Sequence, residues 1–306
     1  MRRREFIALM GATATSPFTA MAQEPGRTYR LGVLAADRRD HPGIIAFFDA
    51  LRRHGFTEGQ NLTIEYRTYR DHYDLIPQYA AELVKAQVDV IATAGEDAIR
   101  AFQQATKTIP IVGLGGDLLK SGFVTSVARP DGNTTGVSFL GADLDGKRQD
   151  ILIEAVPGLR LMAVLVDVAE TTPAKLAALQ EAARAHNIEF SVHRVARGED
   201  IAEAFDAAQA SGATAVNVLW STKFYINRHL IMDRVAAVRL PTIYDLPETA
   251  EEGGFAAYGP RGWQLVRDIM PQQIVKLFRG SKVAEVPVEQ ATKFELVINL
   301  KTVTAS

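Results

Sequence analysis

The amino-acid sequence predicts an α/β protein built as two lobes of similar architecture. Compact apolar runs alternate along the chain with amphipathic stretches of helical period, which is typical of parallel sheets covered by helices on both faces. This alternation pauses near residues 136–141 and then restarts, which indicates two α/β units in succession. The length of 306 residues, 47% of them hydrophobic, is sufficient for two medium-sized lobes.

The first series of elements precedes residue 136. Its apolar runs predict strands at residues 31–34, 62–66, 88–92 and 109–112. Its amphipathic stretches predict helices at residues 41–54, 73–87 and 97–106. The run at 62–66 alternates between apolar and polar residues, as an edge or half-buried strand does. Glycine, asparagine and threonine at residues 132–136 predict a loop before the second series begins.

The second series follows the same pattern. Its apolar runs predict strands at residues 161–166, 190–193, 215–220, 241–244 and 254–258. Helical periodicity predicts helices at residues 147–156, 174–186, 201–210 and 228–238, and a longer one at 263–278. We therefore expect a second lobe with the same layered construction as the first.

The first 22 residues have the features of an export signal. Arg2, Arg3 and Arg4 precede an apolar stretch, and Ala20-Met21-Ala22 supplies a small-x-small cleavage pattern. The apolar stretch is too short for a spanning helix of about 20 residues. The sequence RREFI at residues 3–7 fits a twin-arginine signal, with the general secretory route as the alternative. The prediction is an exported, soluble protein of the periplasm.

Composition argues against several classes of function. The formal net charge is −2 and like charges form no block, so nothing favours a nucleic-acid partner. The absence of cysteine removes disulfides, thiolate metal sites, a thiol nucleophile and the acceptor of a lipid anchor. The six histidines are scattered without a metal-binding spacing. We expect a monomer with no catalytic residue, no metal and no cofactor.

The candidate binding residues follow the predicted strands. In open parallel sheets, ligands bind outside the carboxyl ends of the strands, where helix N-termini offer free N–H groups. Two lobes that present such ends to each other would form a cleft. The residues at these positions are Ala36, Asp37, Gly95, Glu96, Asp97, Gly116, Asp117, Asp167, Trp220, Ser221, Tyr244, Asp245 and Tyr258.

The acidic pair Glu96-Asp97 opens a predicted helix and has two interpretations. It caps the helix and complements the helix dipole, or it accepts hydrogen bonds from an ammonium or hydroxyl group of a ligand. Gly95 leaves the first N–H groups of this helix open to an acceptor on the ligand. Together with Asp117, these residues predict a site for the polar end of a ligand.

Aromatic residues end two strands of the second series. Trp220 and Tyr244 are placed to flank the apolar or aromatic body of a ligand, with Tyr258 as a further candidate. The alternative is that they are ordinary core residues. The chemistry of these candidates predicts a small ligand with an apolar body and one polar end.

Two glycine-containing stretches resemble catalytic or cofactor motifs without matching them. Residues 113–116 lack the third glycine and the acidic residue of a dinucleotide-binding fingerprint, and a tight turn that approaches a ligand or the other lobe explains them better. Residues 136–141 have one residue too many for a nucleophile elbow. We interpret that stretch as a hinge or crossover between lobes.

Several motifs spread over the chain identify a family. They are FTEGQNLTIEYR at 56–67, VDVI at 88–91, TKTIPIV at 106–112, ARPDGNTTGV at 128–137, GGF at 253–255, YGP at 258–260, PVEQ at 287–290 and LVINLK at 296–301. With these motifs the chain resembles the periplasmic substrate-binding components of ABC transporters. The branch it resembles includes proteins that bind aromatic amino acids such as tryptophan or phenylalanine.

The resemblance implies a type I periplasmic-binding-protein fold, with two Rossmann-like lobes joined by three crossovers. The crossovers are expected near Gly141, Gly259 and Pro287. The first lobe would then contain residues 29–140 and 260–286, and the second lobe residues 141–259 and 287–306.

Three departures from the family pattern leave the ligand and the second lobe open. Glu96-Asp97 replaces a small glycine- or threonine-led turn, and Asp117-Leu118 replaces Asp-Pro. Both pairs lie where the polar end of a ligand would dock. Relatives continue with a C-terminal helical tail beyond the position of Ser306.

The function implied by the resemblance is that of the solute-binding component of an ABC import system. It would capture an amino acid or another small organic compound in the interlobe cleft and deliver it to an ABC permease in the inner membrane. One alternative is a ligand-sensing module that transmits its bound state to a membrane receptor. Another is an exported α/β enzyme, for which the chain offers only dispersed carboxylates.

Overall fold

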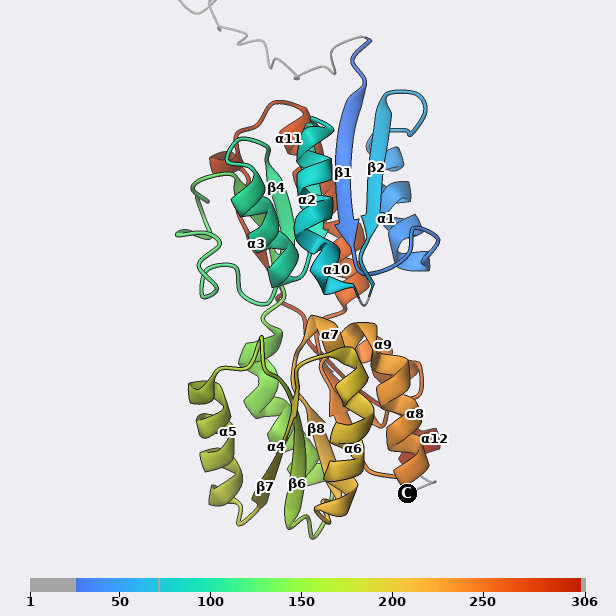
Figure 1. Cartoon of the computed structure of the whole chain (residues 1–306), viewed down its shortest axis with the longest axis vertical. Helices are drawn as coiled ribbons and strands as arrows, with labels where there is room; N and C mark the ends of the chain where they lie inside the picture. The colour runs from blue at the N-terminus through green and yellow to red at the C-terminus, as the bar shows by residue number, and fades with distance from the viewer. Residues whose placement is uncertain (1–25, 71, 304–306) are drawn as a thin grey trace, which may run out of the picture.

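The computed structural model describes residues 26–70 and 72–303, which form two α/β lobes joined by a narrow neck (Figure 1). Each lobe contains a six-stranded sheet. The strand order is β11-β5-β4-β3-β1-β2 in the first lobe and β12-β10-β9-β8-β6-β7 in the second. The predicted fold class of two α/β lobes is therefore confirmed. The predicted export signal lies outside the described residues.

The first lobe is built around an all-parallel sheet. Its strands are β1 (Tyr29–Ala35), β2 (Leu62–Thr68), β3 (Val90–Ala94), β4 (Ile111–Gly115), β5 (Thr134–Ser138) and β11 (Glu289–Gln290). Its helices are α1 (Pro42–Arg53), α2 (Ile76–Lys85), α3 (Glu96–Ala105), α10 (Gly262–Asp268) and α11 (Met270–Phe278). Short 3-10 turns cover Tyr73–Leu75 and Val283–Glu285.

The second lobe repeats this plan with one strand reversed. Its strands are β6 (Leu161–Asp167), β7 (Glu189–Val195), β8 (Ala215–Val218), β9 (Thr242–Tyr244), β10 (Ala256–Gly259) and β12 (Glu295–Ile298), and β12 pairs with β10 antiparallel. Its helices are α4 (Asp145–Ala155), α5 (Pro173–Ala185), α6 (Ile201–Ala210), α7 (Thr222–Ile226), α8 (Arg228–Val238), α9 (Pro247–Glu251) and α12 (Leu300–Val303). Short 3-10 turns cover Gly141–Leu144 and Gly198–Asp200.

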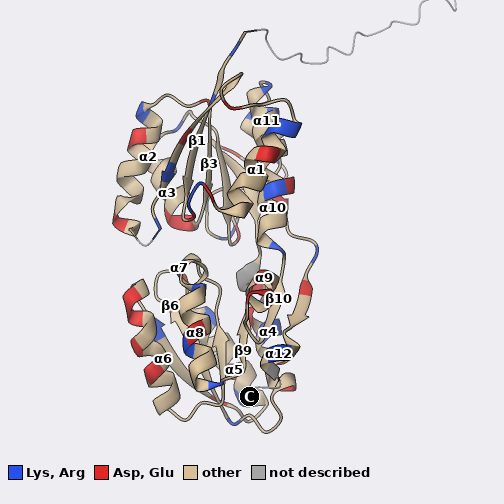
Figure 2. Ribbon diagram, turned by 90° about the vertical axis from the view of Figure 1, so that its right-hand side faces the viewer, with Lys and Arg blue, Asp and Glu red and all other residues tan. Residues whose placement is uncertain are grey.

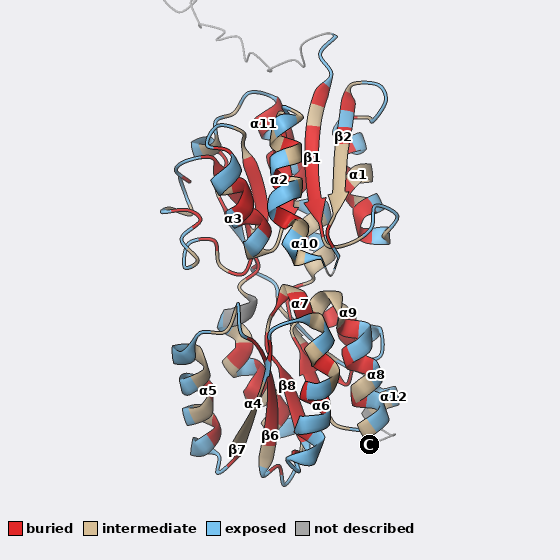
Figure 3. Ribbon diagram, viewed as in Figure 1, coloured by how far each residue is buried: buried red, intermediate tan, exposed pale blue. Residues whose placement is uncertain are grey.

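The central strands of each sheet are apolar on both faces because helices cover both sides of the sheet. In β1, Leu31 and Val33 pack in the cluster that contains α1 and α11, whereas Leu34 packs on the other face, toward α2 and α3. Successive side chains of a strand point to opposite faces, so a central strand needs apolar residues at every position. Figure 3 shows β1, β6 and β8 as mostly buried and the edge strands β2 and β7 as mostly intermediate, with exposed residues on the outer sides of the helices. Acidic and basic residues are interspersed over those outer sides (Figure 2).

One predicted loop is a strand. Residues 134–138 form β5, which is buried and pairs with β4 on one side and β11 on the other. Gly136 has φ +142, and a Cβ added to it would lie 1.9 Å from the carbonyl oxygen of Gly113. The glycine therefore permits a close approach of two strands, not a turn. The loop interpretation of residues 132–136 was wrong at this point.

The long helix predicted at residues 263–278 is divided in two. Helix α10 ends at Asp268 and α11 begins at Met270. Proline has no N–H to donate, and its ring clashes with the carbonyl group four residues earlier. Pro271 therefore fits the first turn of a new helix and not the interior of a long one.

The chain passes between the sheets three times. It leaves the first sheet after β5, returns after β10 and leaves again after β11. Because β11 pairs with β5, with Glu289 opposite Val137 and Gln290 opposite Ser138, residues 289–290 belong to the first sheet. The family resemblance implied that they belong to the second lobe, after a crossover near Pro287, whereas the crossover follows β11. The other lobe boundaries stay predictions.

None of the helices in residues 26–70 and 72–303 has the length and apolar character of a membrane span.

Candidate functional site

A cavity of about 120 Å³ lies where the two lobes meet. The first lobe lines most of it, with the carboxyl ends of β1 and β3 and with side chains from α1 and α10. The second lobe contributes four residues: Trp220, Thr222, Tyr225 and Leu246. The cavity is therefore at the strand ends where the sequence places a ligand.

Aromatic rings form much of the cavity wall. They belong to Phe47, Tyr69, Phe139, Trp220, Tyr225 and Trp263. Phe139 follows β5, and its ring stacks on Trp220 of the second lobe with centroids 4.6 Å apart and planes 24° apart. This stacked pair joins the two lobes at the edge of the cavity.

Asp37 is the one charged residue among those that line the cavity. It stands two residues after β1. Burial raises the pKa of Asp37, and the charges of His41 and Arg228 lower it. Among the described residues, no lysine, arginine or histidine nitrogen lies within 4.0 Å of its carboxylate. Asp37 thus lines the cavity without a paired cation from that part of the chain.

Gly95 brings the start of α3 to the cavity. It has φ +93, which favours glycine, and a Cβ added to it would lie 3.4 Å from both Tyr69 Oη and Thr222 Oγ1. No side chain caps α3. The first turn of α3 carries Glu96 and Asp97, so negative charge stands beside the helix N-terminus.

The other first-lobe candidates lie around the cavity and do not line it. Ser121 donates a hydrogen bond of 2.7 Å to Glu96 Oε1. A Cβ added to Gly116 would lie 3.3 Å from that oxygen and 3.5 Å from Trp220 Nε1, which agrees with a turn that approaches the other lobe. Asp117 Oδ1 accepts hydrogen bonds from the N–H groups of residues 119 and 120 and so stabilises the turn that contains it. The Asp97 side chain is exposed.

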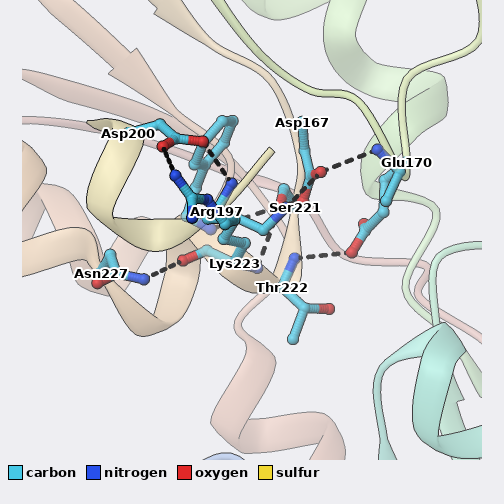
Figure 4. Close-up of polar contacts among 10 residues, drawn as sticks. Asp167, Glu170, Arg197, Asp200, Ser221, Thr222, Lys223 and Asn227 are labelled. Carbon is cyan, nitrogen blue, oxygen red and sulfur yellow. Dashed lines mark hydrogen bonds and ion pairs between the residues drawn. The ribbon is translucent and has the colours of Figure 1, made fainter. Parts of the chain in front are cut away.

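Asp167 and Ser221 form a buried polar network in the second lobe (Figure 4). Lys223 Nζ lies 2.7 Å from Asp167 Oδ1, and Ser221 Oγ donates to Asp167 Oδ2 at 2.6 Å. Ser221 Oγ also accepts from the N–H of Lys223 and caps α7. Neither Asp167 nor Ser221 lines the cavity, but together they fix α7, which carries the lining residues Thr222 and Tyr225.

Glu170 extends this network within the second lobe and is affected by acidic residues of the first lobe. Its Oε1 accepts a hydrogen bond of 3.2 Å from the N–H of Thr222. Burial, then the charge of Asp167 and the smaller effects of Glu96 and Asp97 of the first lobe, raise the pKa of Glu170 to about 8, and the hydrogen bond from Thr222 lowers it. The sequence reasoning missed Glu170, because it lies three residues beyond its strand.

Tyr244 lies in the core of the second lobe and not in the cavity. It is 2% exposed and packs in the cluster that contains α6 and α8. A Cβ added to Gly254 would lie 2.6 Å from its ring. In β9, Thr242 and Tyr244 point away from the face occupied by Ile243. The expected pairing of Trp220 with Tyr244 around one ligand therefore does not occur here.

Asp245 and Tyr258 lie near the connections between the lobes. Arg148 is fully buried, donates to the carbonyl oxygen of Tyr258 at 3.0 Å and pairs with Asp145. Burial raises the pKa of Asp245 to about 6, and Arg148 lowers it. Neither Asp245 nor Tyr258 lines the cavity.

Four of the predicted site residues line the cavity: Ala36, Asp37, Gly95 and Trp220. The sequence reasoning missed the lining residues Tyr69, Phe139, Tyr225 and Trp263. In the described part of the chain, no group of three histidine, aspartate or glutamate residues is placed to hold a metal ion. The arrangement is a chamber with apolar walls, a single carboxylate and a few hydroxyl groups.

Comparisons with known proteins give one family and one fold. The family model described as ABC transporter substrate binding protein matches residues 40–305. A protein of Clostridioides difficile named tyrosine-binding protein is 22% identical over 276 residues, which cover 87% of this chain and 78% of that protein.

Two solved structures share the fold. A conserved domain protein from Vibrio cholerae superposes with a TM-score of 0.81 and 22% identity, over 91% of this chain and 94% of the other. An ABC domain from Streptococcus pneumoniae in complex with L-Trp gives a TM-score of 0.76 and 19% identity, over 90% and 94% of the two chains.

Proposed function

This chain belongs to the family of ABC transporter substrate-binding proteins, and from this premise we propose that it captures a small organic molecule between its lobes for import. The observation that carries the proposal is the cavity lined by both lobes at the carboxyl ends of their strands. The partner would be an ABC permease in the inner membrane, and the chain itself would act as a monomer.

The lining supports a ligand with an apolar or aromatic body. Small-molecule sites combine apolar and aromatic walls with a few polar groups that fix orientation, and this cavity has that composition. The Clostridioides difficile relative is named for tyrosine and the Streptococcus pneumoniae structure holds L-Trp. These names support an amino acid or another small aromatic compound as the class to test first.

We further propose that binding closes the lobes about their three connections. Hinge closure places the bending in a few residues between rigid bodies, and the chain crosses between the sheets three times. The proposed export signal at residues 1–22 would bring the protein to the periplasm.

A thermal-shift screen tests the binding function. The purified protein would be mixed with amino acids, aromatic amines, aromatic acids and nucleosides. A ligand at 100 times its Kd raises the unfolding free energy by about 2.7 kcal/mol. Trp220→Ala should weaken the confirmed ligand by about tenfold or more, because an aromatic cavity wall is lost. Tyr244→Phe is the matched control and should leave affinity unchanged.

Two outcomes would contradict the proposal. A ligand whose affinity is indifferent to Trp220→Ala does not bind in this cavity. Undiminished uptake of the confirmed ligand in cells that lack the protein would contradict import and would favour sensing.

A further inference from the structure

The charge of the cavity lining is wholly negative. Asp37 is its charged residue, and the remaining side-chain polar groups are the hydroxyls of Tyr69, Thr93, Thr222 and Tyr225 and the indole N–H groups of Trp220 and Trp263. Thr93 donates its hydroxyl to the carbonyl oxygen of residue 34 at 2.8 Å. A ligand carboxylate would therefore find no basic side chain among the residues that line the cavity.

The surroundings add to this negative charge. The pKa of Tyr69 is raised by burial, and then by the charges of Glu170, Asp97 and Asp37. Glu170 comes from the second lobe and Asp97 from the first. The pKa of Glu170 is itself raised to about 8, so at neutral pH the negative charge that acts on this wall comes from Asp97 and Asp37 of the first lobe.

Two of the three basic groups that act on Asp37, Arg228 and His41, are bound elsewhere. Arg228 Nε lies 2.8 Å from Glu252 Oε2, and its Nη1 donates to the carbonyl oxygen of Tyr225 at 3.1 Å. His41 Nδ1 accepts from a backbone N–H at 3.1 Å, and the ring stacks on Trp263. The N-terminus of α3 offers N–H groups, but Glu96 and Asp97 in its first turn oppose an anion there.

The aromatic walls suit a cation. The face of an aromatic ring carries partial negative charge and attracts an ammonium group, most strongly where water is excluded. Six aromatic residues line this cavity together with one carboxylate. A carboxylate supplies the counter-ion and hydrogen-bond acceptor that an ammonium group requires.

Building on the proposed function, we infer that the cavity selects an organic cation, namely an amine or quaternary ammonium group on an aromatic or apolar body, and discriminates against ligands that carry a carboxylate. The ammonium group would lie against Asp37 and the aromatic rings would enclose the rest. This ligand class differs from the amino acids named for the relatives.

Matched sets of compounds test the inference by calorimetric titration. Each set has one body and four ends: an amine, an amino acid, a carboxylic acid and a neutral group. Tryptamine, tryptophan, indole-3-propionate and indole form one set, and the phenyl series forms another. We expect the best-fitting amine to bind about tenfold or more tightly than its amino acid, and the acid to bind most weakly.

Asp37→Asn should remove this preference. It should weaken the amine about tenfold or more, in the range for a hydrogen bond to a charged group, and leave the neutral compound unchanged. Asp206→Asn, on the exposed side of α6 and away from the cavity lining, is the matched control, and it should change either affinity by less than about threefold.

The pH dependence of binding is a second readout. Burial raises the pKa of Asp37, so a bound cation must favour its ionised form. Affinity for the amine should fall as the pH decreases through that pKa, and Asp37→Asn should abolish the dependence. The groups that act on Asp37 besides its burial are His41, Arg228, Glu252 and Arg70.

The outcomes separate the two proposals. Trp220-dependent binding of the amino acid or the acid in preference to the amine would overturn the cation preference and leave the cavity as a binding site. If no member of any set binds, both this inference and the proposed binding of small aromatic compounds are overturned.

Discussion

Each lobe has an aspartate at the carboxyl end of the corresponding strand, and the surroundings of the two aspartates differ. β1 and β6 occupy equivalent positions in the two strand orders. Asp167 at the end of β6 is buried and paired with Lys223, whereas Asp37 just beyond β1 lines the cavity, and no basic side chain of the described residues lies within 4.0 Å of its carboxylate. The second lobe thus supplies a counter-ion for its own acid, and the described part of the first lobe supplies none at that distance.

The largest expected effect comes from removing that internal counter-ion. Lys223→Met leaves the 2%-exposed Asp167 carboxylate uncompensated, and we expect the unfolding free energy to fall by about 3–5 kcal/mol in chemical denaturation. The double variant Asp167→Asn/Lys223→Met should regain most of the loss. Asp37→Asn is the comparison in the first lobe and should change stability by about 0.5 kcal/mol or less. Equal losses of unfolding free energy in Lys223→Met and Asp37→Asn would contradict the difference between the two lobes.

Trp220 and Tyr244, which the sequence predicts on either side of a ligand, also differ in their roles: Trp220 lines the cavity and Tyr244 lies in the core of the second lobe. Tyr244 completes the core of the second lobe, so Tyr244→Ala should cost about 3 kcal/mol or more of stability. Its hydroxyl has no hydrogen-bond partner among the described residues, so Tyr244→Phe should be neutral or slightly stabilising. Trp220 packs against the core cluster of the first lobe, and Trp220→Ala should cost less stability than Tyr244→Ala. A reversed order in thermal denaturation would contradict these placements.

Glu170 gives a pH-dependent test of the contact between the lobes. Its pKa is raised from 4.5 to about 8, so between these values the folded protein holds a proton that the unfolded chain has lost. The unfolding free energy therefore falls as the pH rises through this window. Glu170→Gln should be more stable than the wild type at about pH 9, and the two should differ little below the unfolded pKa.

Asp97→Asn should act in the same direction as Glu170→Gln, but less, because Asp97 contributes to the shift from the other lobe. The exposed Glu199 provides the control, and Glu199→Gln should leave the pH profile unchanged. If neither Glu170→Gln nor Asp97→Asn alters the dependence of unfolding free energy on pH, the raised pKa of Glu170 is contradicted.

The smallest effect is expected at the turn where the lobes approach. A Cβ at Gly116 would lie 3.3 Å from Glu96 Oε1 and 3.5 Å from Trp220 Nε1, so Gly116→Ala should cost about 1 kcal/mol or less and weaken the ligand by a few fold. Gly146→Ala is the matched control, because nothing lies within 4 Å of its added Cβ. Unchanged ligand affinity in Gly116→Ala would show that ligand binding does not require the two lobes to approach more closely at this turn.

The sequence locates the strand ends better than it locates the side chains around them. Asp37, Gly95 and Trp220 follow long apolar runs whose ends are visible in the sequence, and all three line the cavity. Tyr244 follows a run of only three strand residues. In so short a run, the phase of the alternation, and hence the face on which a side chain lies, cannot be read.

The missed residues depend on contacts between distant segments. Tyr225 lies on a helix of five residues, which is too short for helical periodicity to appear. Trp263 begins a helix that the sequence does predict, but it reaches the cavity because α10 packs on α1, more than 200 residues earlier in the chain. Local patterns carry no information about such packing.

The first lobe is assembled from two distant parts of the chain, and this affects how the protein emerges during synthesis. The ring of Tyr29 lies 4.9 Å from that of Phe278, and α10, α11 and β11 all follow the main body of the second lobe. A nascent chain therefore cannot close the core of its first sheet until about residue 290 has left the ribosome. The strands β6 to β10, by contrast, follow one another without interruption. The lobe that is translated first is thus completed late, and until then its unfinished apolar surface stays open to chaperones.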